Sequence, residues 1–422
     1  MLNIIWTGFF LLAALTAAWQ VIFLHQAQVV NQMMEALFKT ADTAFRISLG
    51  LTGVMALWLG LMRIGEAGGV MAVICRWLSP LMQKFFPDIP ENHPAFGAMV
   101  MNMAANMMGL DNAATPLGLK AMQELQKLNP DKETASNAQI MFLVINTSSV
   151  TIIPVTIFTY LYQLNYPNPT ELFLPILLAT ACSSLAGVIA VSIYQRINLL
   201  QLPIITFFLV MAAAAALLIT GLLAADKETV QNLSLVVANG FILGIVTLFI
   251  LLATVKRVNV YEEFINGARE GFTIAIGIIP YLVAMLVAIS VFRASGAMDL
   301  LLGAVEHLVA GICRVLAWFN LAPGPDMPRA FIEALPTGLM KPLSGSGARA
   351  LMIETIQTHG VDALSSKMAA VMQGSTETTF YVLAVYFGSV NIKKTRHAVP
   401  CGLIADVAGI GSAVILTHLF FG

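Results

Sequence analysis

Charged residues are scarce in this chain of 422 residues. Lys, Arg, Asp and Glu together make up 11% of it, whereas soluble globular proteins contain about 25%. Apolar residues reach 58% and the mean hydropathy is +0.82. A soluble protein of this size could not cover its exterior with so few charges. The composition excludes a soluble enzyme and a disordered chain, and predicts an integral membrane protein surrounded by the lipid bilayer. The net charge of −1 argues against nucleic acid as a partner.

Metal-binding and nucleotide-binding motifs are also missing. The four cysteines, Cys75, Cys182, Cys313 and Cys401, lie far apart and form no C-x-x-C pair. The six histidines form no H-E-x-x-H motif, so we expect neither a disulfide framework nor a zinc site. The pattern G-x-x-x-x-G-K-[ST] does not occur, which excludes a primary pump formed by this chain alone. We therefore expect no metal and no cofactor apart from a coupling ion.

Long apolar stretches take the place of these motifs. About 20 apolar residues cross a hydrocarbon core of roughly 30 Å, so the sequence predicts an all-α polytopic membrane protein. The first stretch has no basic residue before it, and we interpret it as a retained helix rather than a signal peptide. The stretches are 3–24, 47–62, 138–164, 172–195, 202–225, 231–255 and 271–292, which are uncharged, and 368–392 and 398–421, which each contain one carboxylate.

An internal repeat relates the two halves of the chain. The segment VVNQMMEALFKTADTAFRISLG (29–50) matches RVNVYEEFINGAREGFTIAIG (257–277), and ASNAQIMFLVINTSSVTIIPVTIFTYLYQLN (135–165) matches ALSSKMAAVMQGSTETTFYVLAVYFGSVN (363–391). The chance similarity of two apolar helices does not explain why both matches have nearly the same offset. We predict a first half over 1–198 with a repeat at about 29–165, a linking transmembrane helix over 199–230, and a second half over 231–422 with a repeat at about 257–391.

Basic residues predict how the two repeats are oriented. Lys393, Lys394 and Arg396 follow the second repeat and place that loop in the cytoplasm, whereas the loop 166–171 after the first repeat has no basic residue and is predicted to be external. The helices that follow these loops then cross the membrane in opposite directions. Inverted-topology repeats are typical of secondary transporters, which bind their solutes between discontinuous helices near the bilayer midplane.

Each repeat contains a polar interruption at membrane depth. The first lies at 109–112 and the second at 342–347, where Gly, Pro and Ser break a helix. Irregular backbone within a bilayer is tolerated where it is buried in protein or lines a cavity. We expect the breaks to bind a polar solute, and a structural kink without a ligand is the alternative.

Polar clusters at equivalent positions of the repeats complete the predicted solute site. Residues 146–149 match residues 373–376, and polar groups in lipid must find partners. We therefore expect both clusters to meet the breaks around one cavity, with hydrogen bonds between helices as the alternative role. The predicted substrate-binding residues are Asn102, Asn106, Asn112, Asn146, Thr147, Ser148, Ser149, Ser344, Ser346, Gln373, Ser375 and Thr376.

Acidic residues within the apolar segments are candidates for coupling to Na⁺ or H⁺. Glu377 is the first of them because hydroxyl-bearing residues flank it, and its alternative role is a structural ion pair with Lys341 or Arg349. Asp111 could instead cap a helix. The predicted ion-coupling residues are Glu377, Thr378, Asp111 and Asp406.

The strings that carry these residues resemble a known family. The first half resembles spore maturation protein A through HPAFGAMVMNMAANMMGLDNAATPLGLKAM, ASNA and INTSSVTIIP, and the second half resembles spore maturation protein B through KPLSGSGARA, GSTETTFYVLAVYFGSV and IKKTRHAV. The chain is similar to a fusion of the two, each half with a nucleoside-recognition (Gate) domain, which also occurs in concentrative nucleoside transporters and FeoB-type iron permeases. The resemblance implies a bacterial inner-membrane protein that moves a small solute, and does not imply sporulation.

The sequence thus predicts an ion-coupled secondary transporter of a small polar solute, either nucleoside-like or a small anionic metabolite. The alternative is a non-transporting membrane scaffold or regulator of envelope processes. A serine hydrolase centred on Ser346 is disfavoured, because no histidine has an evident route to that serine and its neighbouring glycines suit a helix break. We expect no enzymatic activity, and a homo-oligomer is compatible with the sequence.

Overall fold

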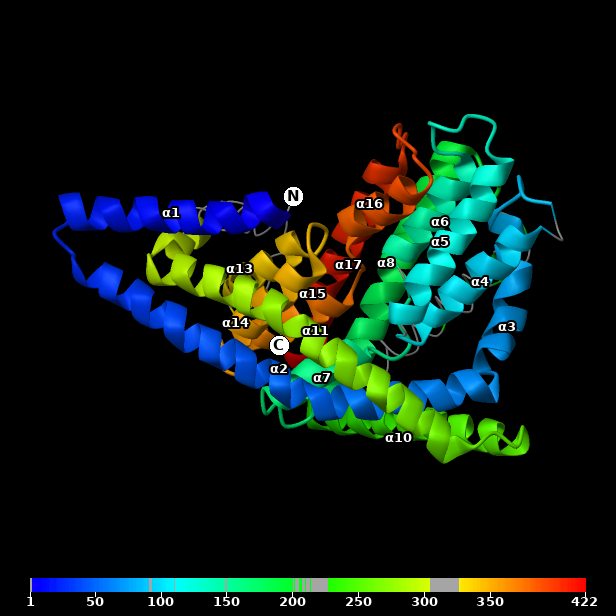
Figure 1. The fold of residues 1–422 in the computed structure, drawn as a ribbon, viewed down its shortest axis with the longest axis horizontal. Coiled ribbons are helices and arrows are strands. Elements are labelled where there is room, and N and C mark those ends of the chain that lie inside the picture. The colour runs from blue at the N-terminus through cyan, green and yellow to red at the C-terminus, as the bar shows by residue number, and fades with distance from the viewer. Residues whose placement is uncertain are drawn as a thin grey trace.

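The computed structural model describes residues 2–90, 93–109, 111–148, 150–199, 201, 205–206, 209, 213, 227–303 and 326–422. This part of the chain is helical without a strand, apart from one isolated bridge between Thr134 and Lys394 (Figure 1). Five of its helices are long and apolar enough to cross a membrane. The prediction of an all-α polytopic membrane protein is confirmed. Most of the linking helix predicted over 199–230 lies outside the described residues.

The order of the helices in the first half recurs in the second half. The first half contains α1 (Leu2–Phe23), α2 (Gln28–Gly68), α3 (Val70–Phe85), α4 (Pro94–Met107), α5 (Asp111–Leu128), α6 (Asn137–Thr147), α7 (Val155–Gln163), the 3-10 helix η1 (Pro169–Leu172) and α8 (Phe173–Gln195). The second contains α10 (Lys227–Val255), α11 (Val260–Ala294), α13 (Asp326–Met340), α14 (Gly345–His359), α15 (Leu364–Gly374), α16 (Thr379–Ser389) and α17 (Ala398–Phe421). By position, α2, α4, α5, α6, α7 and α8 correspond to α11, α13, α14, α15, α16 and α17.

The corresponding helices α2 and α11 lie side by side and run antiparallel (Figure 1). Thr40, early in α2, donates a hydrogen bond to the hydroxyl of Ser290, late in α11, at 2.8 Å. Arg63, late in α2, pairs with Glu263, early in α11, at 3.2 Å. Small residues allow this contact, because a Cβ atom on Gly267 would lie 2.3 Å from the carbonyl oxygen of Leu59.

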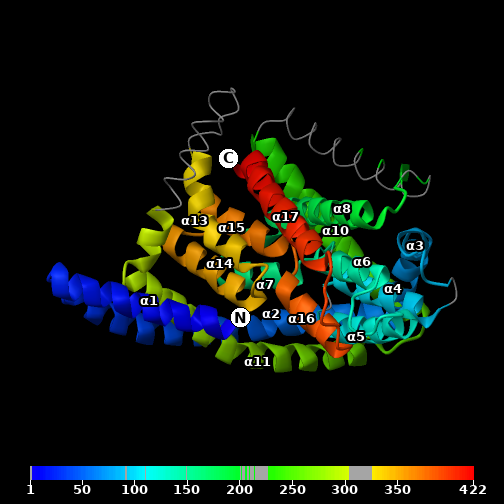
Figure 2. The same cartoon turned by 90° about the horizontal axis from the view of Figure 1, so that it is seen from above.

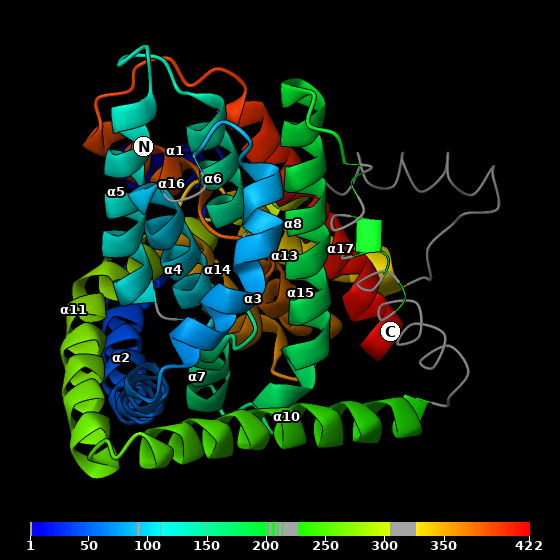
Figure 3. The ribbon, with the colours of Figure 1, turned by 90° about the vertical axis from the view of Figure 1, so that its right-hand side faces the viewer.

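The corresponding helices α8 and α17 are also antiparallel neighbours (Figure 2). The ring of Tyr194, near the end of α8, stacks on His397, which precedes α17, with centroids 5.1 Å apart. Halfway along both helices, the Ser183 hydroxyl donates to the carbonyl oxygen of Ala405 at 2.9 Å. Helix α10 lies across the direction of α8 (Figure 3). Two pairs of helices at corresponding positions thus pack antiparallel, and the inverted topology of the repeats in the membrane stays a prediction.

Two predicted spans are wrong as continuous helices. The stretch 138–164 is divided into α6 and α7, and the stretch 368–392 into α15 and α16. Pro154 interrupts the first stretch because it lacks a backbone N–H. In the second, the N–H of Glu377 bonds to the carbonyl oxygen of Thr147 in the other half at 2.8 Å instead of continuing its own helix. In the first stretch, the N–H of Ile152 bonds to the carbonyl oxygen of Met107 in α4 at 2.8 Å, so tertiary hydrogen bonds replace the helical ladder at both places. The stretches 47–62 and 271–292 form parts of the longer helices α2 and α11.

Candidate functional site

A cavity of about 1040 Å³ lies where the interrupted helices of both halves meet. From the first half, the ends of α4 and α6 and the start of α7 line it. From the second half, the α13–α14 loop and the segment joining α15 to α16 line it. The N–H of Phe380, at the start of α16, donates to the carbonyl oxygen of Pro342 at 3.0 Å, which holds these two segments together. The cavity is therefore built from helix ends of both halves together with one side of α16.

The break before α14 is confirmed, and the sequence accounts for its geometry. Ser344 has an extended backbone and caps α14, because its Oγ accepts a hydrogen bond from the N–H of Gly347 at 3.0 Å. A Cβ atom on Gly345 would lie 2.7 Å from the hydroxyl oxygen of Thr378. Glycine at 345 thus lets the start of α14 approach the α15–α16 segment. The N-terminal end of α14, with its partial positive charge, lies at the cavity.

The break between α4 and α5 is also confirmed. Helix α4 ends at Met107 and α5 begins at Asp111. Gly109 has φ +70°, and a Cβ atom there would lie 2.7 Å from the carbonyl oxygen of Ile153, so the position favours glycine on both counts. The side chains of Asp111 and Asn112 and all of Ser149 lie outside the described residues.

The two asparagines of α4 meet the polar cluster of α6 and a tyrosine of the other half. Asn106 donates to Asn146 Oδ1 at 2.8 Å, and the Tyr386 hydroxyl donates to the same oxygen at 3.3 Å. Asn102 donates to the Tyr386 hydroxyl oxygen at 3.2 Å and to the carbonyl oxygen of Ala114 at 2.7 Å. These bonds join α4, α5, α6 and α16 beside the cavity.

The predicted polar residues divide into those that line the cavity and those that lie behind it. Ser148 and Ser375 are in the second group, and their hydroxyls bond to the carbonyl oxygens of Val144 and Met372 within their own helices, at 2.9 and 2.8 Å. Asn102 and Thr147 are buried behind the wall as well. The predicted residues in the lining are Asn106, Asn146, Ser344, Ser346, Gln373, Thr376, Glu377 and Thr378.

Two cationic residues also line the cavity. From the sequence, we considered them only as partners of Glu377. Lys341 and Arg349 flank the break before α14 and both line the cavity. Arg349 Nε donates to the carbonyl oxygen of Gly345 at 3.3 Å, and its guanidinium lies 5.9 Å from the ring centre of Tyr160 in α7. Their position within the string KPLSGSGAR, directly beside the predicted break, was the signal that could have identified them.

The acidic candidates have different surroundings. Glu377 is half-buried and lines the cavity. Asp406 is 1% exposed and lies behind the wall on α17, where its Oδ2 accepts a hydrogen bond from Thr379 Oγ1 at 2.6 Å. Only the first of the two carboxylates therefore lies in the cavity lining.

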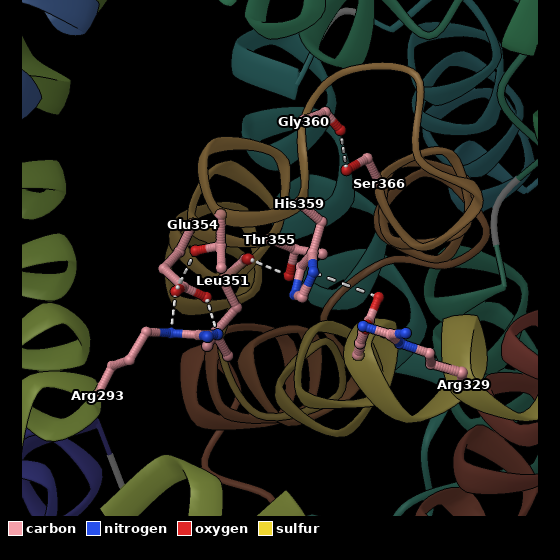
Figure 4. A network of polar contacts seen from close by, with 10 residues as sticks. Arg293, Arg329, Leu351, Glu354, Thr355, His359, Gly360 and Ser366 are labelled. Atoms are coloured by element: carbon pink, nitrogen blue, oxygen red, sulfur yellow. Dashed lines mark hydrogen bonds and ion pairs between the residues drawn. The ribbon is translucent and has the colours of Figure 1, made fainter. Parts of the chain in front are cut away.

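The end of α14 that lies away from the cavity is fixed by a polar network (Figure 4). Arg293 of α11 forms an ion pair with Glu354, and Glu354 also accepts a hydrogen bond from Thr358 at 3.0 Å. His359, the last residue of α14, lies 3.4 Å from a carboxylate oxygen of Glu333 in α13. These contacts hold α14 to α11 and α13, and so fix where its N-terminal end meets the cavity.

Ion pairs between the halves occur at equivalent places. Lys393, after α16, pairs with Glu133, which precedes α6, at 2.6 Å. Lys367, in the first turn of α15, pairs at 2.9 Å with Glu171, which follows α7. The side chains of the second pair are 13% and 11% exposed, against 70% and 59% in the first. One end of the repeat interface is therefore more tightly closed than the other. In the described part of the chain, His, Cys, Asp and Glu form no cluster of three that could hold a metal ion.

Comparison with known proteins identifies one matching family model and two similar proteins. Residues 48–162 match the Gate family model, described as nucleoside recognition. The chain is 40% identical to spore maturation protein A of Bacillus subtilis (strain 168) over 189 residues, which are 45% of this chain and 93% of that protein. It is also 40% identical to spore maturation protein B of the same organism over 195 residues, 46% of this chain and 98% of that protein. The expected resemblance to both is confirmed. No solved structure matches.

Proposed function

Because the chain belongs to the spore maturation protein A and B families and joins both in one polypeptide, we propose that it is an ion-coupled secondary transporter of a small monovalent anion. The proposed location is the bacterial inner membrane. The membrane-spanning helices and the Gate domain support a role in transport, and the names of the two relatives specify no solute.

The observation that carries the proposal is the charge of the cavity. Among the described residues of the lining, Lys341, Arg349 and Glu377 are charged, which leaves one positive charge if all three are ionised. The N-terminal ends of α7 and α14 also face the cavity and favour negative charge. Amide and hydroxyl groups around these charges offer hydrogen bonds to a polar solute. A single anionic group on the solute therefore matches the site best.

A nucleoside is the second candidate solute. The Gate family is described by nucleoside recognition, and the aromatic residues Phe380, Tyr381 and Tyr386 line the cavity beside the side-chain amides of Asn146 and Gln373. Aromatic faces and amides can stack on a base and bond to its edge. A solute with both a base and an anionic group would use both kinds of contact.

The test is a solute screen on the purified full-length protein in detergent. Acetate, lactate, methanesulfonate and uridine are added separately, and the thermal unfolding midpoint is recorded. A solute at 100 times its Kd stabilises the folded state by about 2.7 kcal/mol. We expect monovalent anions to raise the midpoint of the wild type, and Arg349→Gln to lose this effect. The control is Arg46→Gln, since Arg46 is 77% exposed on α2 and pairs with Asp42.

Transport is then measured in proteoliposomes with the best binder of the screen. Uptake of the labelled solute against its gradient, driven by an imposed pH or Na⁺ gradient, supports the proposal. A midpoint raised by uridine and by none of the anions favours the nucleoside. Absence of both binding and uptake for every solute favours the scaffold alternative.

A further inference from the structure

Asp406 is a buried carboxylate whose hydrogen bonds are incomplete. It lies in α17 with 1% exposure, and Thr379 Oγ1 donates to its Oδ2 at 2.6 Å. The hydroxyl of Thr376, which is 3% exposed, also faces the carboxylate, whose other oxygen, Oδ1, lacks a well-formed hydrogen bond among the described residues. A buried carboxylate oxygen without a full hydrogen bond is destabilising, so this arrangement needs an explanation other than stability.

Lys341 connects Asp406 to the cavity. It is 5% exposed and belongs to the cavity lining, and its positive charge acts on the Asp406 carboxylate. Asp406 itself lies behind the wall. An anion that enters the cavity therefore competes with Asp406 for the charge of Lys341. Such competition couples occupancy of the cavity to the protonation state of a residue that does not touch the solute.

The balance of charge determines what happens when an anion enters. With both carboxylates ionised, Asp406 and Glu377 balance Lys341 and Arg349. An anion adds an uncompensated negative charge in a region of low dielectric, which is costly unless a positive charge comes with it. We propose that Asp406 takes up one proton as the anion binds beside Lys341, so that the loaded site is again neutral. This inference rests on the proposed function and makes the transporter an anion–proton symporter.

The other helices that pack on α17 bring no further charge close to Asp406. Within the described residues, α6, α8 and α16 contain no Lys, Arg, Asp or Glu, and they face α17 with neutral groups such as Thr147, Ser183 and Thr379. The charged residue closest in sequence to these helices is Glu377. It lies between α15 and α16 and lines the cavity. The remaining charged residues of the neighbouring helices whose side chains the structure describes form ion pairs of their own, Lys367 with Glu171 and Glu333 with Arg329.

A proton fits the site better than Na⁺. A Na⁺ ion at Asp406 would place a second cation beside Lys341 with one carboxylate between them, and the repulsion is strong where water is absent. A proton instead neutralises Asp406 and leaves the charge of Lys341 for the anion. Glu377 suits this role less because it lines the cavity and faces the solute directly.

The experiment is a pH titration of the full-length protein by infrared difference spectroscopy, which follows the carbonyl stretch of protonated carboxylic acids and needs no solute. We expect one such band to be lost in Asp406→Asn and retained in Glu377→Gln. In Lys341→Met the band should persist to a pH higher by about one unit or more, because the cation that favours the carboxylate is gone. Thr379→Val provides a second variant, in which loss of the hydrogen bond to Oδ2 moves the band without removing it. Loss of the band in Glu377→Gln alone overturns the inference.

The coupling is measured with methanesulfonate, a monovalent anion that does not itself take up a proton near neutral pH. In weakly buffered solution we expect about one proton to be taken up per methanesulfonate bound by the wild type, and none by Asp406→Asn although the anion still binds. Binding without proton uptake in the wild type overturns the inference and leaves the proposed function intact. If methanesulfonate does not bind while the Asp406 band shifts in Lys341→Met, the proton site stands and the anionic solute is wrong.

Discussion

The backbone N–H of Glu377 donates a hydrogen bond to the carbonyl oxygen of Thr147 at 2.8 Å, across the boundary between the two halves of the chain. Thr147 ends α6, and Glu377 lies where α15 gives way to α16. This bond gives a partner to a carbonyl group at the end of a helix in one half. The donor is a backbone N–H from a non-helical segment of the other half. The cavity between the halves is thus part of the fold itself, and neither half can form it alone.

The contact between α2 and α11 should be sensitive to the addition of a single methyl group. In Gly267→Ala the new Cβ would lie 2.3 Å from the carbonyl oxygen of Leu59 and 2.7 Å from Cβ of Arg63. We expect the free energy of unfolding to fall by about 1–3 kcal/mol, the usual cost of overpacking, measured by thermal or denaturant unfolding in detergent.

The matched control is Gly277→Ala in the same helix, because a Cβ atom there meets nothing within 4 Å. It should leave the free energy of unfolding unchanged or raise it, since alanine favours helix over glycine. Equal losses in both variants would show that α2 and α11 do not pack at Gly267.

The sequence predicted the helices and two of the breaks, because both depend on residues that lie close together in the chain. Apolar length marks a membrane helix, and Gly109 and the serine–glycine run at 344–347 mark places where a helix ends. The breaks at 148–154 and 375–378 were not predicted, since long apolar runs lie on both sides of these short segments. These helices end where backbone N–H groups bond to distant segments, Ile152 to Met107 in α4 and Glu377 to Thr147 in the other half, and such contacts cannot be read from neighbouring residues.

The different surroundings of Glu377 and Asp406 could not be predicted from the sequence for the same reason. Both are single carboxylates in apolar stretches, and the sequence favoured Glu377 because of its hydroxyl-bearing neighbours. In the structure, Thr379 bonds instead to Asp406, which lies in a different helix and 27 residues further along the chain. The tertiary fold thus assigns the Thr379 hydroxyl to the carboxylate that the sequence ranked lower.

The antiparallel packing of α8 on α17 predicts loops on opposite sides of the membrane. Asn168 precedes α8, and Lys394 precedes α17. After replacement of the native cysteines, we expect Asn168→Cys to react with a membrane-impermeant maleimide from outside the cell and Lys394→Cys to react only after the membrane is opened. Labelling of both from one side would contradict the inverted topology.

The two ion pairs between the halves should differ in their effect on stability. Glu171→Gln leaves Lys367 buried with its charge uncompensated, and Lys367 is held 4.4 Å from the ring centre of Phe421. We expect a loss of about 3 kcal/mol in the free energy of unfolding. Glu133→Gln is the matched control, because its partner Lys393 is largely exposed, and surface pairs contribute about 0–1 kcal/mol. Similar losses in both would show that the interface is equally closed at its two ends.

The junction between α8 and α17 should weaken in acid. Burial, together with the neighbouring charge of Arg396, lowers the pKa of His397, which stacks on Tyr194 and contacts Gln195 at 3.1 Å. The folded state therefore favours the neutral ring. Its contribution to stability is present above the unfolded pKa of about 6.5 and is lost as the pH falls towards the lower folded pKa. We expect the unfolding midpoint of the wild type to drop below about pH 6.5 by more than that of His397→Gln. A parallel drop in both would assign the acid sensitivity to other groups.

Glu377 should set how much negative charge the cavity accepts. Its carboxylate offsets one of the two cations in the lining, so Glu377→Gln raises the positive charge of the cavity by one without changing the size of the side chain. A unit charge acting over about 4 Å at an effective dielectric constant of about 20 is worth about 4 kcal/mol, and even a third of that changes affinity tenfold. We therefore expect the ratio of the Kd for acetate to the Kd for succinate to rise by roughly tenfold or more, because the divalent anion gains most. Isothermal titration of both anions against the wild type and the variant measures this ratio.

Arg349→Gln, which lowers the positive charge of the same cavity, should change the ratio in the opposite direction. An unchanged ratio in Glu377→Gln would mean that its carboxylate does not face the bound anion, and that Lys341 and Arg349 alone determine the charge of the solute.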